Sequence, residues 1–171
     1  DMLIFMNLGF LGSVAETASM MYHKIDADIY LTSPRSLALS SSYAFPRKRL
    51  YQVAGIAGVE RVMPFYIGYL MWRNPQTQLS RSIFVYGINP RDPVFLMPEL
   101  QSPQHQAALN RWNTTLIDRQ SRPEFGSLTT GTVTEAKRRQ IEIGGQFSLG
   151  TSFSADGNLI MSDRNFRRYL N

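Results

Sequence analysis

Runs of strand-forming apolar and aromatic residues, divided by proline and glycine, fill the middle and the end of the chain. Such runs, bounded by turn residues, are typical of β-strands. Two of them predict a β-hairpin with strands over 65–72 and 82–88 and a turn at 74–77. A second, tighter hairpin is expected over 139–149, with Gly144-Gly145 at its turn.

Shorter segments predict the remaining elements of the fold. Further strands are expected over 26–32, 115–118 and 159–161, and helices over 46–57, 104–112 and 163–170. Three prolines between 91 and 104 predict an irregular crossing between these elements. The fold class is therefore α+β, with a mixed sheet, β-hairpins and a few helices.

The N-terminal segment, 2–24, has its own pattern. Its first ten positions are apolar nearly all round, and polar residues become frequent towards Lys24. A helix of this kind enters either a protein core or a membrane. Its apolar stretch is too short to cross a bilayer. The segment is therefore either an ordinary core helix or the lower end of a helix that emerges from a bilayer.

Composition and charge exclude several classes of function. At 171 residues, 43% of them hydrophobic, the chain predicts a single folded domain over 1–171. It has no cysteine, which excludes disulfides, thiol nucleophiles and cysteine-based metal sites. The net charge is +5, and the basic residues cluster only at 47–49, at 137–139 and around Arg167. We interpret these clusters chiefly as solvated charge at element ends.

The sequence offers few candidate catalytic or metal-binding residues. The two histidines, His23 and His105, lack neighbours at metal-ligand spacing. Asp26 and Asp28 would share one face of a strand, where they could act as an acid–base pair or bind calcium, but a solvated pair at a junction is the favoured interpretation. No nucleophile elbow or phosphate-binding loop is present. We expect no enzyme activity, no metal and no cofactor.

Nucleic-acid binding is the other possibility that the basic charge raises. Phe84 and Tyr86 fall on one strand face, where bases could stack. No motif of an RNA-binding strand accompanies them, so we expect both rings in the core and no nucleic-acid partner.

Six phrases in fixed order resemble the segment just after the first membrane helix of DevC-type ABC transporter permeases, which belong to the MacB-like class. The phrases are Asp1–Phe10, Lys24–Pro34, Val59–Pro64, Val85–Pro90, Thr115–Gly126 and Phe153–Phe166. The resemblance implies a MacB-like periplasmic core domain, with residues 1–25 continuing an absent membrane helix. Domains of this class usually continue beyond the point that corresponds to Asn171, and the chain starts at Asp1, so we expect it to be a segment of a longer protein.

The resemblance also implies a role. In this class two permease subunits dimerise in the inner membrane, a cytoplasmic ATPase subunit drives them, and the periplasmic domain engages an adaptor protein and an outer-membrane channel. DevC-like members are expected to export glycolipid. The expected function is therefore a non-catalytic relay of conformational change for efflux of a lipid or glycolipid-type substrate. The alternative is a free-standing extracytoplasmic ligand-binding or sensor module.

Two segments are candidates for the contact with the adaptor. The irregular region 91–135 is a candidate inserted subdomain, because long irregular segments in compact domains are often functional. The first hairpin carries apolar residues on both strand faces, so one face needs cover, unless the strand is buried on both sides. The expected contact residues are Met71, Trp72, Leu109 and Trp112.

Overall fold

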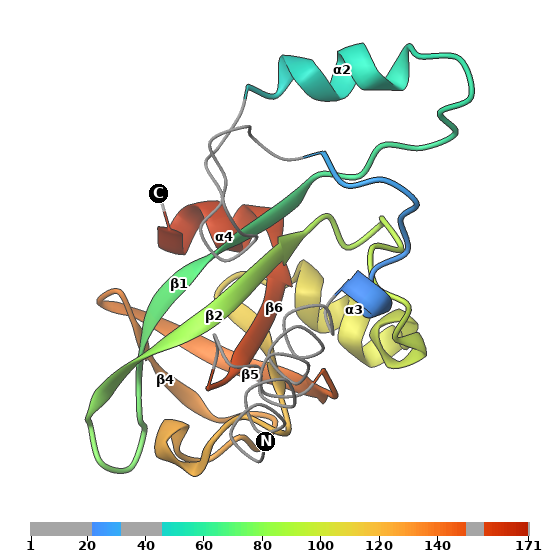
Figure 1. The fold of residues 1–171 in the computed structure, drawn as a ribbon. Coiled ribbons are helices and arrows are strands. Elements are labelled where there is room, and N and C mark those ends of the chain that lie inside the picture. The colour runs from blue at the N-terminus through green and yellow to red at the C-terminus, as the bar shows by residue number, and fades with distance from the viewer. Residues whose placement is uncertain (1–21, 32–45, 150–155, 171) are drawn as a thin grey trace, which may run out of the picture.

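The computed structural model describes residues 22–31, 46–149 and 156–170, and within them six strands close into a barrel (Figure 1). The strands follow one another round the barrel in the order β1-β2-β6-β3-β5-β4. Their bounds are β1 Phe65–Arg73, β2 Ser80–Ile88, β3 Thr114–Asp118, β4 Val133–Ala136, β5 Arg139–Phe147 and β6 Asn158–Ser162. The α-helices of the described residues are α2 Lys48–Ala54, α3 Pro103–Asn110 and α4 Asp163–Leu170, with short 3₁₀ turns at Tyr22–Lys24, Pro98–Gln101 and Pro123–Phe125. The expected α+β class is confirmed.

The first predicted hairpin is confirmed. β1 and β2 pair antiparallel along their whole length, from Phe65 opposite Ile88 to Arg73 opposite Ser80. Asn74 shapes the turn, because its side-chain Oδ1 accepts hydrogen bonds from the backbone N–H groups of Gln76 (2.8 Å) and Thr77 (3.0 Å).

Alternate residues of the strands supply two separate apolar cores. Inside the barrel, Val85 of β2 packs with Ile117 of β3 and Leu159 of β6. On the outer face, Phe84 and Tyr86 are covered by the segment that runs from β2 to α3. The two predicted core aromatics of β2 are therefore buried, as expected.

Helix α4 packs against β1 and β2 and buries Phe166 and Tyr169 in the inner core. It comes so close to the sheet that Gly87 has no room for a side chain: a Cβ there would lie 2.7 Å from Cβ and Cγ of Phe166. Ser162 caps the helix as expected, since its Oγ accepts from the N–H of Asn165 at 3.3 Å.

We expect Gly87→Ala to lower the free energy of unfolding by about 1–3 kcal/mol, because overpacking displaces the helix from the sheet. Gly68→Ala is the matched control, since its Cβ would meet Cδ2 of Leu170, the far end of a flexible side chain. That variant should lose less than about 1 kcal/mol. Urea unfolding of both variants measures the difference, and equal losses would contradict this account of α4.

The second predicted hairpin is wrong. Residues 139–147 form one continuous strand, β5, which runs straight through Gly144-Gly145. The two glycines instead allow α3 to lie directly on the strand. A Cβ at Gly144 would lie 2.6 Å from Cβ of Ala108, and a Cβ at Gly145 would lie 2.7 Å from Cδ2 of His105. The register of β3 against β5 also shifts here, between Thr115 and Leu116.

A different hairpin joins β4 to β5. Its turn is made by Lys137 and Arg138, both with positive φ (48° and 62°), as a tight two-residue turn requires. The sequence offers no glycine or asparagine there, so the usual signal for such a turn is absent.

The sequence predicts a helix over 1–25 and a strand over 26–32 in the N-terminal region. The strand expected over 26–32 is not formed in its described part: residues 26–31 are exposed, and only Ile25 makes a bridge, to Phe95. The helix expected over 1–25 lies outside the described residues, apart from the 3₁₀ turn Tyr22–Lys24. No helix among the described residues is long and apolar enough to cross a membrane.

The segment 91–135 is built into the barrel at its C-terminal end. β3 lies between β6 and β5, and most of β4 also falls within these residues. The preceding part, with Leu100 and Leu109, packs in the outer core beside Phe84. An inserted subdomain with the boundaries 91–135 stays a prediction, and any such unit shares its strands and core with the rest of the domain.

Candidate functional site

The four expected contact residues divide into two buried and two exposed side chains. Trp72 and Leu109 are fully buried, at 0% exposure. Met71 and Trp112 are 53% and 58% exposed. The exposure differs because neighbouring residues of β1 point to opposite faces, so Met71 faces out where Trp72 faces in. The contact of these four residues with a partner stays a prediction.

Trp72 belongs to the framework of the barrel. Its indole Nε1 donates a hydrogen bond to the carbonyl oxygen of Phe125 at 3.1 Å. It is also the β1 residue that pairs with β4, opposite Ala136, where the barrel closes. One side chain thus fills the inner core, satisfies a buried carbonyl and lies at the seam between β1 and β4.

Trp112 lies in a cationic setting on the surface. The guanidinium groups of Arg164 and Arg168, one turn apart on α4, lie over its ring at 5.1 and 5.5 Å from the ring centroid. Tryptophan and arginine are the residues that most often dominate the binding energy of protein interfaces. Both arginines belong to the basic cluster around Arg167 that we interpreted as solvated charge, and their i, i+4 spacing in the predicted last helix is the signal that could have placed them together.

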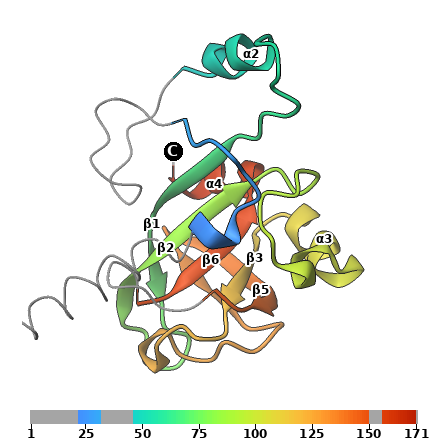
Figure 2. The ribbon, with the colours of Figure 1, turned by 45° about the vertical axis from the view of Figure 1, so that its right-hand side comes forward.

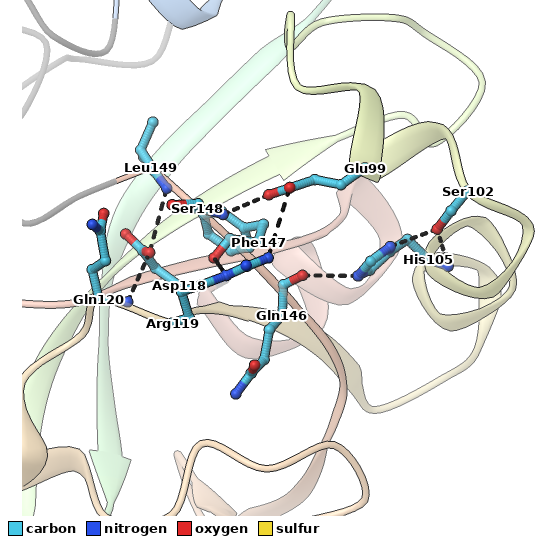
Figure 3. Close-up of polar contacts among 10 residues, drawn as sticks. All are labelled: Glu99, Ser102, His105, Asp118, Arg119, Gln120, Gln146, Phe147, Ser148 and Leu149. Carbon is cyan, nitrogen blue, oxygen red and sulfur yellow. Dashed lines mark hydrogen bonds and ion pairs between the residues drawn. The ribbon is translucent and has the colours of Figure 1, made fainter.

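A buried carboxylate joins the ends of β3, β5 and β6, and Figure 3 shows its contacts with the residues that follow β3 and β5. Asp118 is fully buried, and its Oδ1 accepts from the backbone N–H of Gln120 at 3.1 Å and of Leu149 at 3.3 Å. Its Oδ2 accepts from Nδ2 of Asn158 at 3.1 Å. Hydrogen bonds of this kind offset the cost of burying a charge, so Asp118 acts as a structural link between three strands.

A second polar chain links the β5 end to the segment before α3 (Figure 3). Glu99 accepts from the backbone N–H of Ser148 at 2.6 Å and lies 3.7 Å from the guanidinium of Arg119. Nε2 of His105 donates to the carbonyl oxygen of Gln146 at 2.9 Å, because a carbonyl can only accept.

Ser102 and His105 form a second hydrogen bond, whose direction depends on which ring nitrogen of His105 carries the proton. In the tautomer with its proton on Nε2, Nδ1 accepts from the Ser102 hydroxyl, 2.6 Å away. The same hydroxyl oxygen accepts from the His105 backbone N–H and so caps α3. The pair has the composition of a nucleophile and its base, but each group is held in a contact that fixes α3 against β5.

The acidic residues considered as a catalytic or calcium pair do not form one. Asp26 and Asp28 are exposed on an irregular segment, and Asp26 lies 3.6 Å from the guanidinium of Arg61. Among the described residues no three histidine, cysteine or acidic side chains gather where they could hold a metal ion.

An open depression of about 200 Å³ lies beside the β1–β2 turn and β4. Its lining is mainly polar, and the residues are Arg73, Pro75, Gln78, Val133, Thr134, Glu135 and Gln140. Sites for small molecules are usually deeper and apolar, with volumes of about 300–1,000 Å³. This depression does not have the form of a site that would select a small ligand.

Burial changes the titration of Tyr86 in the outer core and also that of Tyr69, which is more exposed. Tyr86 is 5% exposed, and burial raises its pKa well above the ordinary value, with a further contribution from the negative charge of Asp118. Burial raises the pKa of Tyr69 in the same direction. Tyr86 also packs against Phe65, Phe84 and Phe95, with ring centroids 4.9–5.8 Å apart.

The raised pKa of Tyr86 predicts a loss of stability in alkali. Above pH about 10 the unfolded phenol ionises while the folded one keeps its proton, so unfolding releases a proton. Stability should fall by up to about 1.4 kcal/mol per pH unit from this group. Tyr86→Phe should show a shallower decline between pH about 9 and about 11 in urea unfolding; an unchanged slope would contradict the assignment.

Comparison with solved structures finds a likeness in fold. The backbone is similar to the extracellular domain of the noncanonic ABC-type transporter YknZ from Gram-positive bacteria, with a TM-score of 0.48 and 13% sequence identity. The match covers 72% of this chain and 65% of the length of that one. No family model and none of the curated proteins compared with the sequence match it.

Proposed function

We propose that this chain is a non-catalytic extracytoplasmic domain of an ABC export permease of the DevC-type, MacB-like class. The observation that carries the proposal is where the resembling phrases lie in the fold. The phrases 85–90, 115–126 and 153–166 contain the last four residues of β2, most of β3 and all of β6, which are three neighbouring strands of the barrel.

Side-chain and backbone contacts hold these phrases together. Thr115 Oγ1 donates to the carbonyl oxygen of Ile160 at 3.0 Å, and Arg122 N–H donates to that of Asp156 at 2.9 Å. The link between Asp118 and Asn158 also joins two phrases. Residues with such contacts specify a fold, which supports a resemblance in architecture and mechanical role.

A mechanical role needs a body that moves as a unit. The strands pair round a closed barrel, and apolar cores lie on both sides of β2. Deforming such a body would break ladder hydrogen bonds and core packing together. In the proposed transporter this domain passes ATP-driven movement of the membrane part to the periplasm, for export of a lipid or glycolipid-type substrate.

The partners follow from the same proposal. They are a second permease subunit, a cytoplasmic ATPase subunit, a periplasmic adaptor and an outer-membrane channel, with the permease in the inner membrane. Met71 and Trp112 are the exposed members of the expected contact set, and we propose that they meet the adaptor. The arginines beside Trp112 favour an acidic patch on that partner.

Adaptor binding can be tested in the full permease, purified with its adaptor from solubilised membranes. Trp112→Asp and Met71→Asp should each lower adaptor recovery by about tenfold or more, as for residues central to an interface. Leu96→Asp is the control, because Leu96 is similarly exposed, at 56%, and lies outside the proposed contact. Equal recovery from all three variants would show that these residues are not the contact.

Location can be tested separately, because the chain has no cysteine of its own. Thr130→Cys places a thiol on an exposed loop. A maleimide reagent that cannot cross the inner membrane should label this variant in intact cells and should not label the unsubstituted protein at this segment. Labelling only after lysis would place the domain on the cytoplasmic side and overturn the proposal.

A further inference from the structure

A segment of the domain stands away from the barrel in both views of the fold (Figures 1 and 2). It consists of residues 46–59, here called the basic arm, and contains α2. None of the residues of α2 is buried. Tyr51 is 74% exposed and Ile56, just after the helix, is 58% exposed. The arm therefore presents large apolar side chains that the described part of the domain does not cover.

The charge of the basic arm has one sign. Arg47, Lys48 and Arg49 are all exposed, and residues 46–59 include no aspartate or glutamate. Within the described residues none of these three cations forms an ion pair, and Arg49 donates to the neutral side chain of Gln52 at 3.0 Å. Their charge is thus available to a partner.

The cationic and apolar side chains lie together. Lys48 and Tyr51 are three residues apart in the helix and so are neighbours on its surface, with Arg47 one turn before Tyr51. Three cations at the start of the helix do not stabilise it, because the N-terminal end of a helix already carries a partial positive charge. A surface that combines several cations with an exposed aromatic ring is typical of peptides that lie in the interface of a bilayer.

We infer that the basic arm docks on an anionic lipid surface, with the cations at the phosphate level and Tyr51 and Ile56 entering the interface. Charge complementarity identifies the lipid, because phosphate headgroups supply the anions that the arm lacks. The exposed apolar residues favour a bilayer over a nucleic acid, which would offer Ile56 nothing to pack against. In the proposed permease this contact would orient the domain on its own membrane, but vesicle binding does not depend on that function.

Vesicle co-sedimentation tests the inference with the chain as printed. Vesicles of equal parts phosphatidylcholine and phosphatidylglycerol should bind it at low salt, and pure phosphatidylcholine vesicles should bind it much more weakly. Replacing all three arm cations with glutamine should lower affinity for the anionic vesicles by about tenfold or more. The double variant Tyr51→Ser, Ile56→Ser should also lower the affinity for the anionic vesicles. This loss should persist at high salt, because salt screens the charges but not the apolar contact.

A matched control separates the arm from net charge. Lys137, Arg138 and Arg139 form a second basic triplet at the β4–β5 turn. Lys137→Asn, Arg138→Gly and Arg139→Gln together remove the same charge and suit the turn. This variant should keep vesicle binding. Equal losses from the two triple variants, no binding to anionic vesicles at low salt, or salt-sensitive binding of single-stranded RNA without vesicle binding would each overturn the inference.

Discussion

Trp72→Ala should lower the free energy of unfolding by about 3–5 kcal/mol, a large part of what a domain of this size has. The side chain is fully buried in the inner core, so its removal leaves a cavity. It also takes away the donor to the Phe125 carbonyl and the residue that pairs β1 with β4. Urea unfolding followed by far-ultraviolet circular dichroism measures the loss without relying on tryptophan fluorescence.

Two further variants make this result specific to Trp72. Trp72→Phe keeps most of the apolar volume but leaves the Phe125 carbonyl without its donor, so we expect a loss of about 1–3 kcal/mol. Met71→Ala changes the next residue along β1, which is exposed, and should change stability by less than about 1 kcal/mol. If Trp72→Ala behaved like Met71→Ala, the closed seam of the barrel would be wrong.

Asp118→Ala should have the second large effect, a loss of about 2–6 kcal/mol. It would leave the N–H groups of Gln120 and Leu149 and the amide of Asn158 without their carboxylate. The donors of Leu149 and Asn158 are buried, and each buried donor without a partner costs about 1–3 kcal/mol. Hydrogen exchange at Leu149 should speed up in this variant, because its N–H loses a direct partner.

Conservative variants at this position test the hydrogen bonds themselves. Asp118→Asn keeps one acceptor oxygen for the two backbone N–H groups but places an amide against the amide of Asn158. It should lose less than Asp118→Ala. Combining it with Asn158→Asp restores a donor–acceptor pair and should recover part of the stability. A double variant that is less stable than both single ones would contradict the assigned contact.

The hairpin of β1 and β2 was predictable from sequence, and the course of the chain at a site of close packing was not. In β2, Val85 points into the barrel and Phe84 and Tyr86 point to the outer core, as the pattern indicates. At Gly144-Gly145 the same kind of reasoning failed, because a glycine pair signals either a turn or a close approach. Here the approach of α3 decided, and that is a tertiary effect which no local pattern shows.

The exposure of the candidate contact residues was predictable only in part, for a related reason. Hydrophobicity identified Met71, Trp72, Leu109 and Trp112 as notable, but it did not show which faces would be covered. Leu109 lies on a short helix against β5, where glycines let it pack closely, and so it is buried. The role of the Asp118 carboxylate does not show in the sequence, because two of its hydrogen-bond partners lie 31 and 40 residues away.

The most direct test of the central claim is the nucleotide sequence of the reading frame on both sides of this segment. The account predicts about 20 predominantly apolar residues running directly into Asp1, and three further spans of this kind after Asn171, as in a permease with a large extracytoplasmic domain. A signal peptide or start codon at Asp1 with no apolar spans downstream would contradict it. The domain would then be a free-standing module, and the ligand-binding or sensor interpretation would take its place.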